Sequence, residues 1–175
     1  MLIQEKALCI RNAEEADCEQ LAAWWNDGRV MAHAGFPLGL GTTPEKVAEK
    51  LASDSDETGR RLIISWRDRA IGEMSYRNLG EGTAEIGIKI CESDCQEKGL
   101  GRVLLSLLIR ELFDMGYARI VLDTNVKNTR AQHVYELLGF EKLRVNENAW
   151  TDQLGEAQSS VDYALTPERF RDWAE

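Results

Sequence analysis

Residues 96–113 read QEKGLGRVLLSLLIRELF, a glycine-containing turn followed by a strongly apolar stretch. Apolar side chains fall on every side of the helix that this stretch predicts, so we expect a central helix packed on several faces. Gly99 and Gly101 allow unusual torsions and close approach, so that amide N–H groups and the helix N-terminus converge on one point. Such a point suits an anion, most naturally a pyrophosphate. A strand-to-helix turn that simply needs glycine would contain the same residues.

The charges beside this turn are consistent with an anion site. Lys98 and Arg102 add local positive charge to a chain whose formal net charge is −9, although both residue types are also common on ordinary protein surfaces. The spacing excludes two nucleotide-binding motifs, since the segment contains neither G-x-x-x-x-G-K-[ST] nor G-x-G-x-x-G.

Strand patterns precede the turn. The alternation of isoleucine with other residues in TAEIGIKI predicts a strand over 83–90. Two further apolar runs, separated by a tight polar turn, predict a hairpin. Thr42 and Glu45 form a capping-box pattern before Pro44. The other expected elements are a strand at 9–11, a helix at 13–25, a glycine-rich loop at 34–41, a helix at 44–53 and the hairpin strands at 61–66 and 70–76.

Downstream of the central helix, the run IVL at 120–122 is typical of a strand buried on both faces. A helix separates it from strand 83–90, so the two strands should be parallel. Asn128 is the expected N-cap of a short amphipathic helix that ends before Gly139. Strands at 140–145 and 160–165, the polar segment between them and a terminal helix from Pro167 complete a single domain over residues 1–175.

Composition narrows the function classes. A net charge of −9 repels nucleic-acid phosphates and anionic lipids, so we expect neither nucleic acid nor a membrane as a partner. There is no apolar run long enough to span a membrane, and the charged start of the chain argues against a signal peptide. The cysteines match no zinc or disulfide spacing. We therefore expect a cytoplasmic protein without a metal, with homodimerisation left open; the four cysteines are Cys9, Cys18, Cys91 and Cys95.

Two segments in register resemble the motifs of one enzyme superfamily. Gln96-x-x-Gly99-x-Gly101 is similar to the Q-x-x-G-x-G/A motif with which GNAT acetyltransferases bind the pyrophosphate of coenzyme A. Residues 128–140 resemble the N-x-x-A-x-x-x-Y-x-x-x-G-F block of the same superfamily. The segments 10–13, 24–27 and 84–87 look like the branch that contains ribosomal-protein alanine acetyltransferases and small-molecule amine acetyltransferases.

The resemblance implies an α/β (α+β) fold with a mixed, mostly antiparallel sheet of six to seven strands flanked by helices. The sheet would be splayed between its fourth and fifth strands, where acetyl-CoA inserts. The implied cofactor-binding residues are Ile88, Ile90, Gln96, Glu97, Lys98, Gly99, Leu100, Gly101, Arg102, Asn128, Ala131 and Tyr135. The backbone of the two isoleucines would hold the pantetheine arm, and Arg130 could reach a phosphate or solvent.

Thioester aminolysis needs a neutral amine, a stabilised oxyanion and a protonated leaving thiolate. Tyr135 is the candidate acid, because a phenol held beside the thiolate can give it a proton; it could equally be one member of an apolar helix face. Glu85 is the candidate base and Glu73 an alternative, although a charged residue on an exposed strand face is the commoner situation. His33 and His133 are weaker candidates. Main-chain N–H groups at the end of strand 83–90 would stabilise the oxyanion.

The sequence thus predicts an acetyl-CoA-dependent N-acetyltransferase, an acyltransferase in which a primary amine attacks the thioester directly. The acidity of the chain favours a small cationic amine, such as a polyamine or aminosugar, met by carboxylates from 27–44, Glu73 and Glu85. One alternative is an acetyltransferase that modifies the N-terminus of a ribosomal or other protein. Another is a sensor that binds acetyl-CoA without catalysis.

Overall fold

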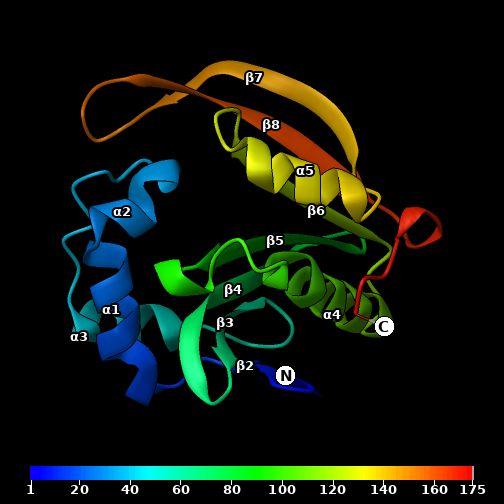
Figure 1. The fold of residues 1–175 in the computed structure, drawn as a ribbon, viewed down its shortest axis with the longest axis horizontal. Helices are drawn as coiled ribbons and strands as arrows, with labels where there is room; N and C mark the ends of the chain where they lie inside the picture. The colour runs from blue at the N-terminus through cyan, green and yellow to red at the C-terminus, as the bar shows by residue number, and fades with distance from the viewer. Residues whose placement is uncertain (175) are drawn as a thin grey trace.

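Eight strands form one sheet in the order β1-β2-β3-β4-β5-β6-β8-β7 in the computed structural model, which describes residues 1–174 (Figure 1). Every neighbouring pair is antiparallel except β5 and β6, which run parallel as expected. The strands are β1 (Leu2–Glu5), β2 (Leu8–Asn12), β3 (Gly59–Trp66), β4 (Arg69–Gly80), β5 (Thr83–Ile90), β6 (Arg119–Asn125), β7 (Glu141–Thr151) and β8 (Ala157–Leu165).

The sheet has more strands than the six to seven expected. The additional strand, β1, pairs with β2 through a turn in which Lys6 has a φ of 55°. Its four residues have no fully buried side chain, so they carry little hydrophobic pattern. At the other end of the sheet, the polar segment 146–159 was expected to be a connection. It instead extends β7 and β8 into a long hairpin, whose exposed faces explain its polar sequence.

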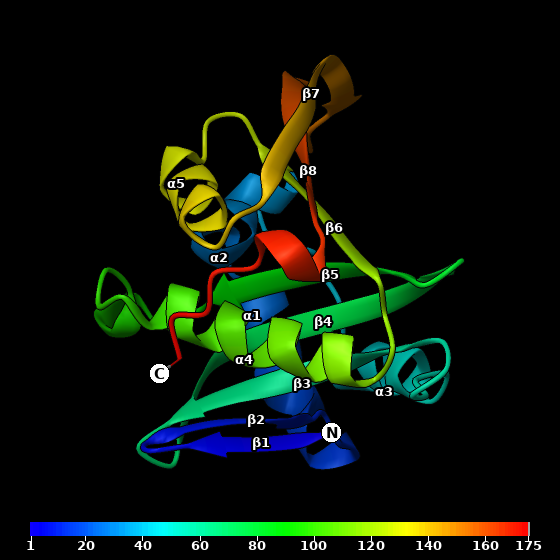
Figure 2. The same cartoon turned by 90° about the vertical axis from the view of Figure 1, so that its right-hand side faces the viewer.

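Helices cover both faces of the sheet, as Figures 1 and 2 show. The central helix α4 packs on one face together with α5, and Leu104, Leu108 and Ile109 are fully buried there. On the opposite face, α1 and α3 enclose a second core around Trp25, Val47 and the sheet residue Ile63. Each such side chain stabilises the fold by about 1.5–3 kcal/mol. The helices are α1 (Cys18–Asn26), α2 (Gly28–Met31), α3 (Pro44–Leu51), α4 (Leu100–Asp114) and α5 (Thr129–Leu137).

Three local expectations were wrong. The α3 N-cap is Thr43, whose side chain accepts from the Lys46 N–H, and not Thr42. The first helix begins at Cys18, after a 3₁₀ turn over Glu15–Asp17. The terminal helix is only a 3₁₀ turn over Pro167–Arg169. Beyond that turn the chain is extended because it docks along α4, where the Trp173 N–H donates to Ser106.

The parallel contact between β5 and β6 is short. Only residues 83–85 pair with residues 119–121. Beyond this point β6 stays paired with β8 up to Asn125, while β5 stays paired with β4 up to Ile90. The two strands therefore separate, as expected between the fourth and fifth strands of the predicted sheet. No helix among residues 1–174 is long and apolar enough to cross a membrane.

Candidate active site

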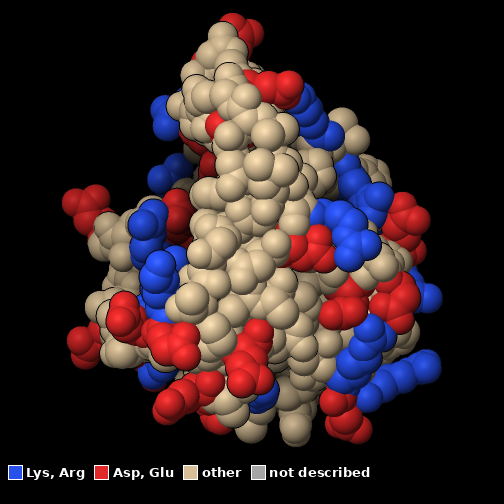
Figure 3. Space-filling view, turned by 90° about the vertical axis from the view of Figure 1, so that its left-hand side faces the viewer, with Lys and Arg blue, Asp and Glu red and all other residues tan. Residues whose placement is uncertain are grey.

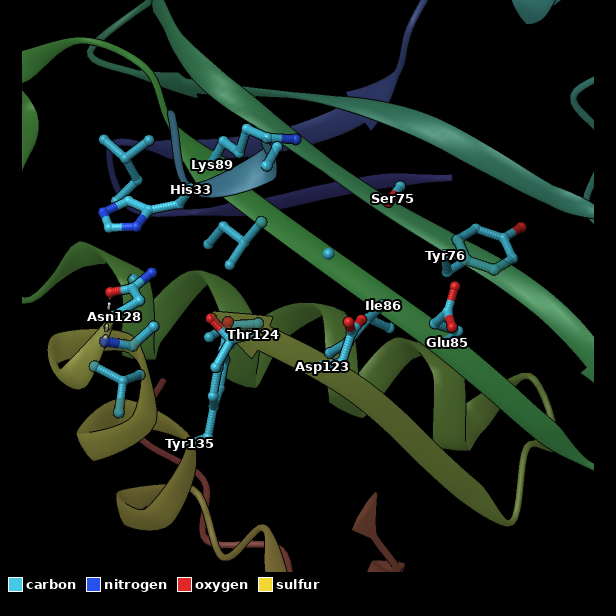
Figure 4. Close-up of a pocket in the computed structure, with 18 of the residues that line it drawn as sticks. His33, Ser75, Tyr76, Glu85, Ile86, Lys89, Asp123, Thr124, Asn128 and Tyr135 are labelled. Atoms are coloured by element: carbon cyan, nitrogen blue, oxygen red, sulfur yellow. Dashed lines mark hydrogen bonds between the residues drawn. The ribbon is translucent and has the colours of Figure 1, made fainter. Parts of the chain in front are cut away.

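A cavity of about 1580 Å³ occupies the region where β5 and β6 separate. Its lining comes from β5, β6, the start of α4 and α5, and on its far side from α2, α3 and β3. Figure 4 shows side chains from β5, β6 and α5, among them Glu85, Asp123 and Tyr135, around the gap between the two strands. The expected site residues Ile88, Ile90, Gln96, Glu97, Gly99, Leu100, Gly101, Arg102, Asn128, Ala131, Tyr135 and Glu85 all line it.

The separating edge of β5 carries unpaired backbone groups. The Cys91 N–H donates to Ile71 on β4, whereas the Gly82 carbonyl accepts from residues 118 and 119 on the β6 side. Since alternate residues of a strand point their N–H and C=O groups to opposite edges, those of Ile86 and Ile88 point towards the β6 side. The β6 ladder has already ended there. This edge can therefore hydrogen-bond a ligand.

The glycine turn is joined directly to this edge. The Gln96 side-chain amide donates to the Ile90 carbonyl at 2.9 Å. Glu97 and Gly99 have φ values of 60° and 73°, and Gly99 is the N-cap of α4 without a side-chain cap. A Cβ added to Gly101 would meet nothing within 4 Å. The uncapped N–H groups of α4 and the open space over Gly101 fit an anionic group such as a pyrophosphate.

The positively charged side chains at and near this turn differ in whether they line the cavity and in what they contact. Lys98 is exposed and is not part of the cavity lining. Arg102 lines the cavity and lies over the Trp173 ring, 4.9 Å from its centroid. Arg130, on α5, also lines the cavity and forms a 2.8 Å ion pair with Glu97. The guanidinium of Arg130 thus lies beside the turn, close to where phosphate charge would be bound.

Residues 128–140 place α5 along the other wall. The Asn128 side chain accepts from the Ala131 N–H at 3.2 Å, which is the N-cap expected from the sequence. Tyr135 is buried, and its ring makes an edge contact with Phe140 and a tilted contact with Tyr163. Burial raises the pKa of Tyr135 to about 12, with smaller contributions from the charges of Asp123 and Tyr163. The hydroxyl therefore keeps its proton throughout the physiological pH range.

Two carboxylates line the cavity where β5 and β6 separate. Glu85 forms a 2.8 Å ion pair with Arg77 on β4. Asp123 lies two residues beyond Val121, the partner of Glu85, so it projects from the same face of the sheet. Desolvation raises the pKa of Asp123, and the charges of Glu85 and Asp162 act in the same direction. Sequence reasoning missed Asp123, although a charged residue directly after an apolar strand run was a detectable signal.

The alternative bases lie in different environments. Glu73 is 1% exposed and is absent from the cavity lining. It accepts from the Trp25 indole at 2.9 Å and forms ion pairs with Arg61 and Lys89, each at 3.3 Å. His33 and His133 both line the cavity. Of the carboxylates expected to face the acceptor, only Glu85 does so.

The charge of the cavity differs from that of the whole chain. Among the described residues 1–174, its lining contains eight Lys or Arg side chains and four Asp or Glu side chains, whereas the chain as a whole has a net charge of −9. Figure 3, which views the side of the molecule at the left of Figure 1, shows Lys and Arg on both sides of a broad uncharged band. The carboxylate-rich acceptor site expected from composition is therefore not what lines this cavity.

The tip of the β7–β8 hairpin contacts the loop after α2 at the end of the cavity that is lined by His33, Ala34 and Trp150. Gln153 accepts from the Leu38 N–H and donates to the Gly39 carbonyl, each at 2.9 Å. Trp150 lies against Gly35, where an added Cβ would be 2.4 Å from the indole ring. Gly35 also has a φ of 96°, so this close approach needs glycine. Sequence reasoning assigned the loop but not its partner.

Curated relatives match parts of the chain. The [ribosomal protein bS18]-alanine N-acetyltransferase of Escherichia coli is 40% identical over 57 residues, which cover 33% of this chain and 38% of that protein. The mycothiol acetyltransferase of Cellulomonas flavigena is 36% identical over 67 residues, covering 38% of this chain and 19% of that protein. The chain thus matches less than half the length of each of these relatives.

Solved structures match nearly the whole chain. The spermidine N-acetyltransferase from Vibrio cholerae, in complex with CoA and spermine, has a TM-score of 0.81 at 21% identity, covering 94% of this chain and 98% of that one. The ribosomal-protein-S5-alanine acetyltransferase from Vibrio fischeri has a TM-score of 0.83 at 17% identity, covering 98% and 99%. At these identities the likeness establishes the fold. Residues 7–141, most of the chain, match the family model described as "Acetyltransferase (GNAT) domain", and the chain therefore belongs to the GNAT acetyltransferase family.

Proposed function

We propose that this protein is an N-acetyltransferase that transfers the acetyl group of acetyl-CoA to a primary amine. The observation that carries the proposal is the unpaired β5 edge at Ile86 and Ile88. It is joined to the uncapped start of α4 through Gln96 and faces the same cavity as Tyr135. An extended, amide-containing arm that ends in a diphosphate is complementary to such an edge and turn.

The residues present fit acetyl-CoA. The N–H groups at 97–102 and the start of α4 would hold the pyrophosphate, with Arg102 and Arg130 beside it. The free N–H and C=O groups of β5 would bind the pantetheine amides, as strand addition does for peptides. Bound in this way, acetyl-CoA supplies a thioester carbon that an amine can attack.

The chain's own groups meet the demands of aminolysis. An N–H group of the β5 edge would donate to the developing oxyanion. Tyr135, protonated throughout the physiological range, would donate a hydrogen bond and then a proton to the leaving sulfur. Its raised pKa makes full transfer less favourable than from an exposed phenol, so the hydrogen bond would form before the proton moves. Asp123 and Glu85, which both line the cavity, would take the proton of the amine.

A small cationic amine is the acceptor that the acidity of the chain predicts. The V. cholerae relative acts on spermidine by its name, which favours such an acceptor, whereas the relatives named for ribosomal proteins favour a polypeptide N-terminus. The lining charges do not favour a polyamine, because cationic side chains outnumber carboxylates. The acceptor of this proposal is therefore a primary amine, without a stated charge.

An acceptor screen tests the function. The protein would be incubated with acetyl-CoA and, in turn, polyamines, aminosugars and short peptides, with release of free thiol as the readout. Amine-dependent release is the expected result. Binding of acetyl-CoA by calorimetry without thiol release in any assay would favour the sensor alternative. If neither binding nor release occurs, the assignment of the cavity is wrong.

A further inference from the structure

Three cationic side chains gather around Trp25 at the side of the cavity that is lined by α2, α3, β3 and β4. We call this side the acceptor side. Lys50 Nζ is 5.4 Å and Arg61 Cζ is 5.1 Å from the centroid of the Trp25 ring. Lys89 Nζ is 3.3 Å from Glu73, which also receives the Trp25 indole N–H. The three cations line the cavity, whereas Glu73 lies behind them and is 1% exposed. We call Lys50, Arg61 and Lys89 the basic cluster.

The basic cluster has more positive charge than the protein neutralises. Glu73 serves both Arg61 and Lys89, and no described carboxylate forms an ion pair with Lys50. Asp54 also lines the cavity, but its Oδ2 accepts from the Arg61 backbone N–H. Even if Asp54 is counted in full, three cations face two carboxylates. The cluster keeps a surplus of one positive charge.

The three side chains of the basic cluster also have more hydrogen-bond donors than the protein satisfies. A guanidinium has five N–H donors and each ammonium has three. Among residues 1–174, the side-chain ion pairs of Arg61 and Lys89 both go to the single carboxylate of Glu73, and the Lys50 ammonium has none. The side chains of Arg61 and Lys89 are about one-third exposed, at 31% and 32%. Donors are therefore available to a ligand that brings its own anionic acceptor, and a guanidinium is well shaped to bind a carboxylate.

Other cations of the acceptor side already have partners. Arg60 is paired with Asp56, Arg29 with Asp27 and Arg77 with Glu85. These pairs are locally neutral. The basic cluster is therefore the part of the acceptor side where positive charge is in excess.

The strand position of Lys89 indicates how far the cluster lies from the reacting amine. Lys89 lies on β5 two residues from Gly87 and four from Glu85, about 7 and 13 Å along the strand at 3.3 Å per residue. The proposed function places the amine near Asp123 and Glu85, beside the β5 edge. A carboxylate directly beside the amine, as in a free amino acid, falls short of this backbone separation. An acidic side chain at the second or third residue of an extended peptide can span it.

From these observations we infer that the basic cluster binds an acidic side chain at the second or third residue of a polypeptide whose N-terminal amine is acetylated. This inference rests on the proposed function. It names the acceptor class as an acidic polypeptide N-terminus, in place of the cationic small amine expected from the acidity of the whole chain.

A peptide series tests the inference on the unmodified protein. Three peptides would start with Ala-Glu-Glu, Ala-Gln-Gln or Ala-Lys-Lys and share every later residue, with free glutamate and spermidine as small-molecule acceptors. We expect kcat/KM to fall in the order Glu, Gln, Lys, by about ten- to hundredfold from Glu to Gln, as for one charge-assisted contact. Added salt should reduce the preference.

A matched pair of variants tests whether the preference for the glutamate peptide depends on the basic cluster. Lys50→Glu reverses one charge of the cluster at an exposed position, whereas Lys46→Glu makes the same change on the same helix outside the cavity. We expect Lys50→Glu to abolish the preference for the glutamate peptide and Lys46→Glu to keep it, with thermal melts confirming that both variants fold.

The outcomes separate the two proposals. Equal rates for all three peptides, or a preference that persists in Lys50→Glu, would overturn the inference while leaving the acetyltransferase function intact. Faster acetylation of spermidine or of free glutamate than of any peptide would overturn the polypeptide assignment. Failure of every amine to release thiol would contradict the proposed function itself.

Discussion

Glu85 and Asp123 lie on the two strands that separate to form the cavity (Figure 4), and the charge of Glu85 raises the pKa of Asp123. Desolvation makes the larger contribution to this shift. Glu85 is itself held by Arg77. A carboxylate with a raised pKa is a better base than an ordinary aspartate, so Asp123 joins Glu85 as a candidate proton acceptor.

Removing Asp123 and removing Glu85 should therefore have different effects on kcat and on its pH profile. We expect Asp123→Asn to lower kcat by about 10²-fold, as for the loss of a general base. Glu85→Gln should keep more activity and move the acidic limb of the kcat profile to lower pH. The sign follows because a neighbouring negative charge that raises the Asp123 pKa has been removed. A limb that moves to higher pH, or an Asp123→Asn variant with full activity, would assign the base elsewhere.

Tyr135→Phe should lower kcat by about 10²-fold or more while the affinity for acetyl-CoA changes little, because only the hydroxyl is lost. Tyr163→Phe is the matched control, since Tyr163 packs against Tyr135 but does not line the cavity. Steady-state kinetics and calorimetry measure the two quantities. Comparable activity in both variants would leave Tyr135 with a packing role alone.

The effect of a substitution at Gly101 on acetyl-CoA binding should depend on the size of the new side chain. Gly101→Ala places a methyl group where nothing lies within 4 Å, so the protein should fold and gain up to about 1 kcal/mol of helix stability. Gly101→Phe should fill the space over the turn and weaken acetyl-CoA binding strongly, with a melting temperature close to that of Gly101→Ala. Calorimetric titration measures the affinity. If both variants bind acetyl-CoA as the unmodified protein does, the pyrophosphate is bound at another place.

Alkaline stability should depend on Tyr135. Its pKa is raised from 10.0 to about 12 in the folded protein, so between these values the unfolded chain loses a proton that the folded protein keeps. This contribution to stability is complete below pH 10 and is lost as the pH rises through about 12, at roughly 1.4 kcal/mol per pH unit. Tyr135→Phe should show a shallower decline in the free energy of unfolding. Denaturant titrations from pH 9 to 12 measure it, and equal slopes would contradict the assignment.

Local pattern was sufficient to predict much of the fold. The alternation in residues 83–90 predicted β5 with its observed bounds, and the apolar stretch after Gly101 predicted α4. The capping role of Asn128 and the glycine turn were also readable, because each depends on residues a few positions apart. The two motifs in register identified the superfamily before any spatial arrangement was available.

What the sequence by itself determined was the order of most helices and strands, the family and the set of residues at the glycine turn and on α5. Only the tertiary structure decided which backbone groups of β5 are unpaired, because that depends on β6 staying with β8 as β5 stays with β4. It also brought Asp123 beside Glu85 and closed the hairpin tip over the loop at 35–41. The sign of the cavity's charge was likewise a tertiary property. Net charge sums all side chains, whereas an acceptor meets only those that long-range contacts turn towards it.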